Sequence, residues 1–286
     1  MQPDCDYAEY LADPDKPLEW DHIAQLVLST SKDESSCSCP ICLSDPVAPM
    51  VAKCGHTFCW TCLLKYLSFG EKAWRKCPIC YDPIYPNGLK PVRFFHTAKM
   101  TTATIENPTI IELTLMKRKC SSTIALPQES YAAWGAPKKA PSVNLTEAVR
   151  FARIIECGQS YLDSILHEQR DDLERSEKEL LDSSHGPTAK TAYLYEKQFY
   201  ERCQKSLRDS MTLDRLKNCS VTIPPGEVDE KTFSFYQAAD GQNIYIHPLD
   251  SKILKYEYGS YDAFPSLLFA TVIGVQDTSI DAVLVI

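Results

Sequence analysis

The sequence has no long hydrophobic run, which is the feature that would indicate a membrane span. None of its segments approaches the roughly 20 consecutive apolar residues that cross a bilayer. The first residues, Met1 to Asp6, carry neither a basic stretch nor an apolar one, so we expect no secretory signal peptide. From both features we expect a protein with no membrane partner.

Basic residues are also in deficit, with 30 Lys and Arg against 38 Asp and Glu, for a formal net charge of −8. Such a balance argues against nonspecific nucleic-acid binding by the chain as a whole. Residues 37–99 are the exception, with eight basic side chains against three acidic ones. This local excess indicates either a solvated face or a surface for an acidic partner. With 44% hydrophobic and 24% charged residues, the composition is that of a globular protein.

The cysteines are unsuited to a secreted disulfide framework because their number, thirteen, is odd and their distribution is uneven. Eight lie between residues 37 and 80, and the remaining five are scattered singly. This distribution is typical of a reduced intracellular protein with one metal-binding module. We therefore expect a cytoplasmic protein, with the nucleus left open.

The cysteine block contains eight zinc-type ligands in four pairs. They read Cys39-x2-Cys42-x11-Cys54-x-His56-x2-Cys59-x2-Cys62-x14-Cys77-x2-Cys80. Thiolate and imidazole are the ligands that structural zinc prefers, four to each tetrahedral site. A disulfide cluster would not explain His56, and a plant-homeodomain finger would place its histidine fifth. Cys37 is an alternative first ligand, but its spacing to Cys39 is too short, so we interpret it as a spare thiol.

This order of ligands resembles that of a RING finger. The resemblance implies a cross-brace, in which Cys39, Cys42, Cys59 and Cys62 bind one Zn²⁺ and Cys54, His56, Cys77 and Cys80 bind a second. Metal binding would supply folding free energy on the order of 10 kcal/mol per site, which so small a segment needs. Four protein ligands leave no open coordination position, so both cofactors are expected to be structural.

The same resemblance implies a shallow apolar groove for a ubiquitin-conjugating enzyme. In RING ligases this groove combines an aliphatic residue after the first ligand, a tryptophan in the central helix and a proline after the seventh ligand. The matching residues are Ile41, Trp74 and Pro78, with Leu43 beside them. The alternative is that Ile41 and Trp74 only fill the core of a small domain. Many active RINGs carry Arg or Lys after the eighth ligand, where this chain has Tyr81.

The remaining sequence predicts an α+β fold, in which the RING is followed by a β-rich module that a helical pair interrupts. Strands are expected at 109–116, 123–126, 233–236, 243–247 and 269–275, and helices at 145–182, 189–217 and 252–258. The expected parts are an acidic lead-in (1–36) with a short helix capped by Asp21, the RING (37–90), a strap with the first strands (91–140), the helical insertion (141–220) and the second β part (221–286). Because the chain ends in apolar residues, we expect this last part to be truncated.

Several further segments resemble RING finger protein 10 and its fungal and protist relatives. They include Leu115-Met-Lys-Arg118, Phe235-Tyr-Gln-Ala-Ala-Asp-Gly-Gln242, Ile246-His-Pro-Leu249 and Glu257-Tyr-Gly-Ser260. This resemblance implies a RING-type E3 ubiquitin ligase whose substrates are proteins of the small ribosomal subunit, and whose contact with nucleic acid would come only through the ribosome. Tyr81 fits this family.

No catalytic nucleophile is expected in the chain. A ligase of the covalent type needs a reactive cysteine outside its zinc sites, and no histidine motif accompanies the scattered cysteines. We expect these to be buried packing residues: Cys120, Cys157, Cys203 and Cys219. The RING would then hold the charged conjugating enzyme beside a substrate lysine.

Two other functions fit the sequence. Tyr81 would suit a RING scaffold that activates no conjugating enzyme. The basic residues Lys65, Lys72, Arg75 and Lys76 would suit a zinc-dependent RNA-binding module.

Overall fold

The computed structural model describes residues 13, 15–16, 18–31, 38–69, 72–97, 109–120, 122–134, 141–142, 149–183, 187–212 and 231–272. The chain divides into two compact units. Unit 1 contains residues 19–96 and 157–218, and unit 2 contains residues 97–156 and 219–286, together with short N-terminal pieces. The helical pair, although it lies between the two β parts in sequence, belongs to the same unit as the cysteine block. No helix among the described residues has the length and apolar character of a membrane span.

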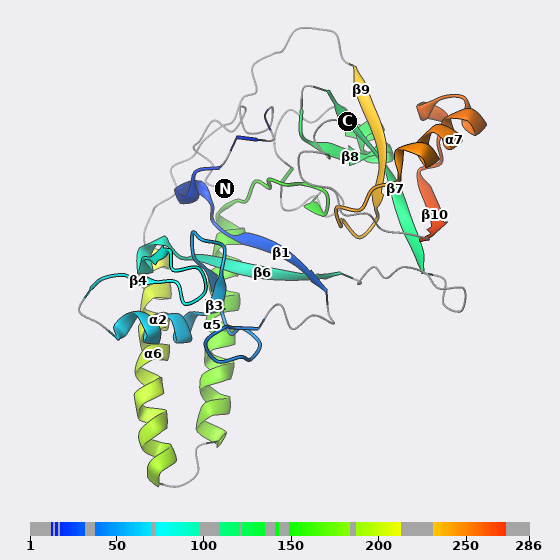
Figure 1. The fold of residues 1–286 in the computed structure, drawn as a ribbon. Helices are drawn as coiled ribbons and strands as arrows, with labels where there is room; N and C mark the ends of the chain where they lie inside the picture. The colour runs from blue at the N-terminus through cyan, green and yellow to red at the C-terminus, as the bar shows by residue number, and fades with distance from the viewer. Residues whose placement is uncertain are drawn as a thin grey trace. The chain divides into compact units, whose positions relative to one another are not determined.

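Unit 1 is built on a four-stranded sheet in the order β1-β6-β2-β3 (Figure 1). These strands are β1 (Leu26–Ser31), β2 (Pro49–Val51), β3 (Thr57–Cys59) and β6 (Lys90–Thr97). Strand β2 pairs antiparallel with both β3 and β6. The strap was expected to connect the RING to the next module. Residues 90–97 instead form β6, a strand of the sheet that carries the cysteine block. A small hairpin carries the last two cysteines of the block in its loop, with β4 (Arg75–Lys76) antiparallel to β5 (Pro83–Ile84).

Three helices pack in unit 1: α2 (Trp60–Ser68), α5 (Gln159–Ser183) and α6 (Pro187–Thr212). Helix α2 buries Trp60, Leu63 and Leu67, whose three- and four-residue spacing places them on one face. Leu173 from α5 and Cys203 and Leu207 from α6 are buried in the same hydrophobic cluster. The core of the cysteine block thus continues into the helical hairpin.

The N-terminal part of unit 1 differs from its expectation. The predicted helix capped by Asp21 is wrong, because the chain forms only a 3-10 turn, η1 (Trp20–His22), with Glu19 at its N-cap and no side-chain cap. Trp20 instead donates its indole N–H to the carbonyl oxygen of Gly88 at 2.6 Å. Gly88 ends a second 3-10 turn, η3 (Pro86–Gly88), just before β6.

The first long helix is shorter than predicted. The periodicity predicted a helix from residue 145, whereas α5 begins at Gln159, and residues 145–148 lie outside the described part. Gly158 precedes it, a residue with poor helix propensity whose carbonyl accepts the N–H groups of Tyr161 and Leu162. Upstream of it, Glu156 forms a β-bridge with Ser142, and Ile154 is buried. The residues from 149 to 156, which were predicted as the start of this helix, therefore belong to unit 2. The second helix, predicted for 189–217, is confirmed as α6 to residue 212, and residues 213–217 lie outside the described part.

Unit 2 is an antiparallel sheet centred on β7 (Ile110–Lys119). Strand β7 pairs with β8 (Ala125–Pro127), β9 (Thr232–Ala238) and β10 (Leu267–Thr271). In this sheet Leu115 lies opposite Tyr236, and Leu113 opposite Leu268. The two β parts, which the sequence predicts as one β-rich module, therefore contribute strands to one sheet.

The described part of unit 2 also contains the helices α3 (Gln128–Trp134) and α7 (Pro248–Tyr258) and the 3-10 turn η4 (Tyr261–Ala263). The helix predicted for 252–258 is confirmed and starts four residues earlier, at Pro248. The strand predicted at 243–247 is wrong, since that segment makes only an isolated bridge between Tyr245 and Gln237. The predicted strand at 269–275 corresponds to β10, which ends at Thr271, and residues after 272 lie outside the described part.

Candidate metal centres and binding groove

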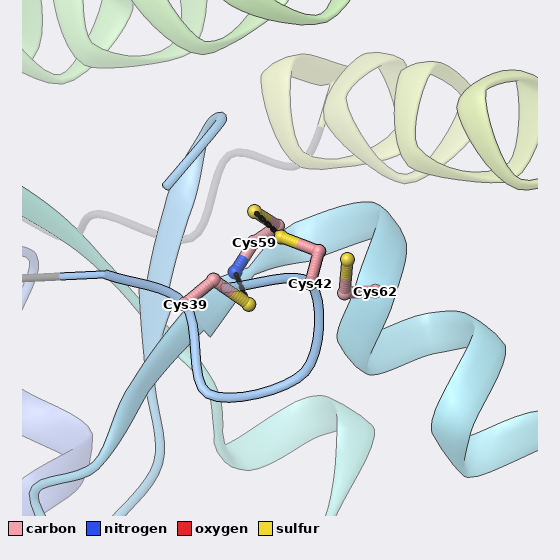
Figure 2. Close-up of side chains that lie close together, drawn as sticks. All are labelled: Cys39, Cys42, Cys59 and Cys62. Carbon is pink, nitrogen blue, oxygen red and sulfur yellow. Dashed lines mark hydrogen bonds between the residues drawn. The ribbon is translucent and has the colours of Figure 1, made fainter. Parts of the chain in front are cut away.

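The first zinc site gathers Cys39, Cys42, Cys59 and Cys62 (Figure 2). Cys39 and Cys42 come from the loop before β2, whereas Cys59 ends β3 and Cys62 lies in the first turn of α2. The sulfur atoms of Cys42 and Cys59 lie 3.7 Å apart. Zn–S bonds of about 2.3 Å in a tetrahedron would place two sulfurs about 3.8 Å apart, so this edge fits zinc.

The second zinc site gathers Cys54, His56, Cys77 and Cys80. Cys54 and His56 come from the turn between β2 and β3, and the two other cysteines from the loop between β4 and β5. The sulfur of Cys77 lies 3.6 Å from Nδ1 of His56. Zn–S and Zn–N bonds in a tetrahedron predict about 3.5 Å for this edge. In each site the four ligand atoms lie within 4.8 Å of one another, and the donor sets suit two structural Zn²⁺ ions.

The sulfur atoms are close enough to change one another's protonation. Hydrogen bonds from the thiols of Cys59 and Cys62 hold the pKa of Cys39 far below its ordinary value. The same contact with Cys39 raises the pKa of Cys59 to about 12. Burial raises the pKa of Cys54 to about 11 in the second site. Because a divalent cation stabilises all its thiolate ligands together, this crowding is what a zinc site requires.

Backbone N–H groups support the first site as well. The N–H of Cys59 donates to the sulfur of Cys39 at 3.3 Å, and the N–H of Val47 donates to the sulfur of Cys59 at 3.3 Å. Figure 2 shows the first of these contacts between the loop and the start of α2. Such outer contacts orient the ligands of a metal site.

The pairs Cys39–Cys42 and Cys77–Cys80 form the same tight turn. The N–H of Leu43 donates to the carbonyl of Cys39 at 2.7 Å, and the N–H of Tyr81 donates to the carbonyl of Cys77 at 3.0 Å. Leu43 and Tyr81 both have left-handed backbone conformations, with φ of 61° and 67°. The two turns therefore present the residue after the second cysteine in the same way.

The expected groove residues lie on these two turns, with one exception. Leu43 and Tyr81 are 78% and 70% exposed, Ile41 is 37% exposed, and Pro78 is also exposed. Ile79, which the sequence interpretation did not name, is exposed as well; its position matches that of Ile41 in the first turn. These side chains remain accessible beside the metal sites and do not fill the core.

Trp74 is the exception, because it lies outside the central helix in which its expected counterpart sits. Helix α2 ends at Ser68, and Trp74 is in the loop before β4. Its ring is half-buried, with the ring of Tyr85 at 6.2 Å and the ammonium group of Lys72 at 5.3 Å. These contacts fix the indole beside the hairpin β4–β5.

The basic residues of this region contact other groups of unit 1. Lys65 forms an ion pair with Glu196 of α6 and lies 5.3 Å from the ring of Tyr195. Arg75 lies 4.4 Å from the ring of Tyr66 and donates to its carbonyl. Three of the four side chains that suggested an RNA surface, Lys65, Lys72 and Arg75, are thus partly neutralised or covered by their own unit.

The cysteines outside the zinc sites differ in environment. Cys157 and Cys203 are buried, as expected, and burial raises the pKa of Cys203 to about 12. The expectation of burial is wrong for Cys120, which is exposed after the last residue of β7. Cys5, Cys37 and Cys219 lie outside the described residues. Neither buried thiol is suited to accept ubiquitin as a thioester, since such a group must be accessible.

Comparison with known proteins identifies residues 39–80 as a zinc finger of the C3HC4 type, the RING finger. An uncharacterized RING finger protein of Schizosaccharomyces pombe is 28% identical over 94% of this chain. The E3 ubiquitin-protein ligase MAG2 of Saccharomyces cerevisiae is 25% identical over 93%. The E3 ubiquitin-protein ligase RMA1 of Arabidopsis thaliana is 37% identical, over 23% of the chain.

These matches divide into two kinds. The two yeast proteins match nearly the whole chain, whereas the plant protein matches about a quarter of it. The chain spans 45% and 43% of the lengths of the two yeast proteins. It therefore contains a RING finger with two zinc sites and is homologous to RING-type E3 ligases at a general level.

Proposed function

We propose that this chain is a RING-type E3 ubiquitin ligase that binds a charged ubiquitin-conjugating enzyme and promotes non-covalent transfer of ubiquitin to substrate lysines. The observation that supports it most directly is the pair of zinc turns that leaves Ile41, Leu43, Pro78 and Tyr81 accessible. Exposed aliphatic side chains held by a rigid metal site have the character of an interface anchor. Relatives named as E3 ubiquitin-protein ligases add support.

In the proposed mechanism, the chain contributes position and orientation. The turn residues bind the conjugating enzyme, and Tyr81 lies where its hydroxyl can donate a hydrogen bond at the edge of that contact. The attacking amine and the thioester belong to other proteins, so the acceleration comes from holding the two reactants in a productive geometry. Zinc supplies only structural support, because both ligand sets are complete.

Ile41→Ala tests the groove directly in a lysine-discharge assay with a panel of conjugating enzymes. We expect the variant to lose at least about tenfold in discharge rate, since removal of a central interface anchor costs about 2 kcal/mol or more. Zinc content, measured by mass spectrometry or a chromophoric chelator, should remain at two ions per chain.

Leu194→Ala is the matched control, because Leu194 is an aliphatic residue of α6 that is 66% exposed and far in sequence from the zinc turns. It should discharge ubiquitin like the unmodified chain. If Ile41→Ala loses zinc, Ile41 is a core residue and the groove is misassigned. If the unmodified chain fails to accelerate discharge with any enzyme of the panel, the chain is a scaffold.

We further propose that the substrates are proteins of the small ribosomal subunit and that the chain acts in the cytoplasm. Support for the substrate comes from the resemblance to RING finger protein 10, carried by segments such as Phe235–Gln242. Support for the compartment comes from the zinc-binding thiols, which must stay reduced. Ubiquitin-remnant profiling of cells that carry either the unmodified chain or Cys39→Ser tests the substrate. Ubiquitin remnants on small-subunit proteins should be fewer in the cells with Cys39→Ser than in those with the unmodified chain. Equal numbers of these remnants in both would contradict this assignment.

A further inference from the structure

Helix α7 in unit 2 has a stripe of apolar side chains on its outer face. Leu249 and Ile253 are each 59% exposed, and Tyr256 is 92% exposed. Their spacing of four and then three residues places them on one side of the helix. Scattered exposed apolar residues are normal on protein surfaces, but three in one stripe point to an interaction site.

The opposite face of α7 is anchored. Leu254 packs on the cluster formed by Leu113, Leu115, Tyr236 and Phe264, and the ring of Tyr258 meets that of Phe264 edge-on at 5.9 Å. The outer stripe is therefore displayed from a fixed support.

Both ends of the helix are also capped. The imidazole Nδ1 of His247 accepts the N–H of Leu249 at 3.2 Å, and the N–H of Gly259 donates to the carbonyl of Lys255 at 3.0 Å. Gly259, the C-cap residue, has φ of +76°, a value that glycine adopts without the steric cost of a Cβ atom. Because the helix is already formed, binding to a partner costs little conformational entropy for ordering it.

Charged residues flank the stripe with opposite signs. At 100° per residue, Asp250 and Glu257 follow one edge of the stripe and Lys252 lies along the other. Within the described part of the chain, no ion pair involves these three side chains. Lys255, farther round on the lysine side, lies 5.0 Å from the ring of Tyr261. The stripe thus has an acidic border and a basic border.

The charged borders and the small size of the stripe indicate which kind of partner can bind it. Acidic residues along one edge would face the negative headgroups of a membrane surface, which disfavours lipid. Three side chains on a helix of 11 residues present too little area for a flat dimer, which buries about 800 Å² per partner. A groove that surrounds the stripe on both sides buries more of each side chain, and opposite charges on its rims match the borders.

We propose that α7 is a recognition helix that inserts Leu249, Ile253 and Tyr256 into an apolar groove of a folded partner protein. The rim of that groove is basic along the Asp250 and Glu257 edge and acidic along the Lys252 edge. Recognition of a helix through residues at such spacing is a recurrent mode of protein binding. The site is separate in sequence from the zinc turns and does not depend on ligase activity.

Photo-crosslinking of the full chain tests the site in cells. The probe is p-benzoylphenylalanine in place of Tyr256, and the control carries the same probe in place of Leu194, on α6. We expect a distinct protein adduct at position 256 only, with the crosslinked peptide in an apolar groove whose rims carry the stated charges. No adduct, identical adducts at both positions, or an adduct only to a second copy of the chain would overturn the proposal.

The partner protein identified by crosslinking is then purified without the crosslink. Calorimetry of its binding to the full chain tests the stripe quantitatively. Ile253→Asp should weaken binding about 30-fold or more, as for the loss of an anchor residue, whereas Leu194→Asp should leave it unchanged. Lys252→Glu should weaken binding at low salt, and less at high salt. Equal affinities of the Ile253→Asp variant and the unmodified chain would overturn the proposal. So would Ile253-dependent binding to phosphatidylcholine–phosphatidylserine vesicles without any binding to that protein. Lysine discharge by Ile253→Asp should be normal, which separates this result from the ligase test.

Discussion

Tyr81 and Leu43 occupy the same place in two copies of one backbone turn. Both residues have positive φ, a conformation that costs a residue with a Cβ on the order of 1 kcal/mol. The hydrogen bonds that their N–H groups donate to Cys39 and Cys77, together with the metal ligands on either side, hold them there. A glycine would relieve the strain but would remove a side chain that the turn exposes. The side chains at both positions are therefore available for contact with a partner.

Tyr81→Arg should increase ubiquitin discharge. Arginine at this position would donate several charge-assisted hydrogen bonds, whereas tyrosine donates one neutral bond. We expect an acceleration of up to about tenfold, since a hydrogen bond to a charged group contributes roughly 1.5–3 kcal/mol and part of that is offset by lost side-chain entropy. The strain of the positive φ is common to both residues, so stability should change little. Tyr81→Phe is the control, and a rate for Tyr81→Arg no higher than that of Tyr81→Phe would contradict this role.

Gly241 is a second residue whose conformation decides what the position tolerates. It follows Asp240 in the turn after β9 and has φ of +87°. A Cβ atom there would lie 2.4 Å from the carbonyl oxygen of Arg150, a backbone atom that cannot easily move. Gly259 has a similar φ, +76°, but open space around it.

Gly241→Ala should therefore destabilise unit 2 more than Gly259→Ala. Gly259→Ala, the control, should lose about 1 kcal/mol of stability through backbone strain alone. Gly241→Ala adds a steric clash and should lose about 2–4 kcal/mol in total. Urea unfolding followed by tyrosine fluorescence measures both. Equal free energies of unfolding for the two variants would show that the segment around Arg150 moves away without cost.

The helical hairpin α5–α6 is the element that extends the RING core. Leu173 of α5 is completely buried, and Cys203 and Leu207 of α6 share its cluster with Leu63 and Leu67 of α2. Gln169 of α5 also donates an N–H to the sulfur of Met50 on β2 at 3.2 Å. The zinc module is therefore stabilised by apolar packing from distant parts of the sequence as well as by metal.

Leu173→Ala should lower the stability of unit 1 by about 2–5 kcal/mol, because it leaves a cavity in a well-packed cluster. Leu181→Ala removes the same atoms from the same helix at a position that is 51% exposed, and should have little effect. Urea unfolding of the zinc-loaded chain, monitored by helical circular dichroism, measures the difference. If both variants unfold at the same urea concentration, the hairpin does not pack on the RING.

The sequence was most informative where chemistry fixes spacing. The eight zinc ligands follow from the series of four closely spaced ligand pairs, and the structure brings together the two sets that the RING resemblance implies. Strand β7 was also predicted, from its β-branched run, and so was the part of α7 from 252 to 258, which ends at Gly259. Local pattern thus predicts ligands and individual elements.

Long-range packing was much harder to predict. The amphipathic pattern of α5 indicates an apolar face, but nothing in its spacing identifies the RING as the surface it covers. Trp74 was expected in a helix, whereas α2 ends at Ser68 and ring contacts with Tyr85 and Lys72 hold the indole in a loop. Segment 243–247 was expected as a strand, but only Tyr245 forms a bridge to β9. For segment 243–247 tertiary contacts override the local preference, whereas the place of Trp74 departs from what the RING resemblance implied.

At the scale of the whole chain, the zinc ligands are distributed unequally between the two units. All eight zinc ligands lie in unit 1, and three of them, Cys39, Cys59 and Cys77, are buried in the same cluster as the α5–α6 residues. Among the described residues of unit 2, no set of ligands for a metal ion occurs. Its core is instead the apolar cluster around Tyr236 and Leu115. The two units should therefore respond differently to loss of zinc.

Removal of zinc with a strong chelator should unfold unit 1 and leave the sheet of unit 2 folded. Each structural site contributes on the order of 10 kcal/mol, so the two together exceed the roughly 5–15 kcal/mol stability of a typical domain, and the apolar packing of α5 and α6 cannot compensate for both ions. Hydrogen exchange read by mass spectrometry distinguishes the units. Amides of α2, α5 and α6 should lose protection after chelation, whereas those of β7 and β9 should keep it. Equal loss of protection in β7 would mean that the two units fold as one cooperative structure, and retained protection in α5 and α6 would mean that the hairpin is stable without the RING.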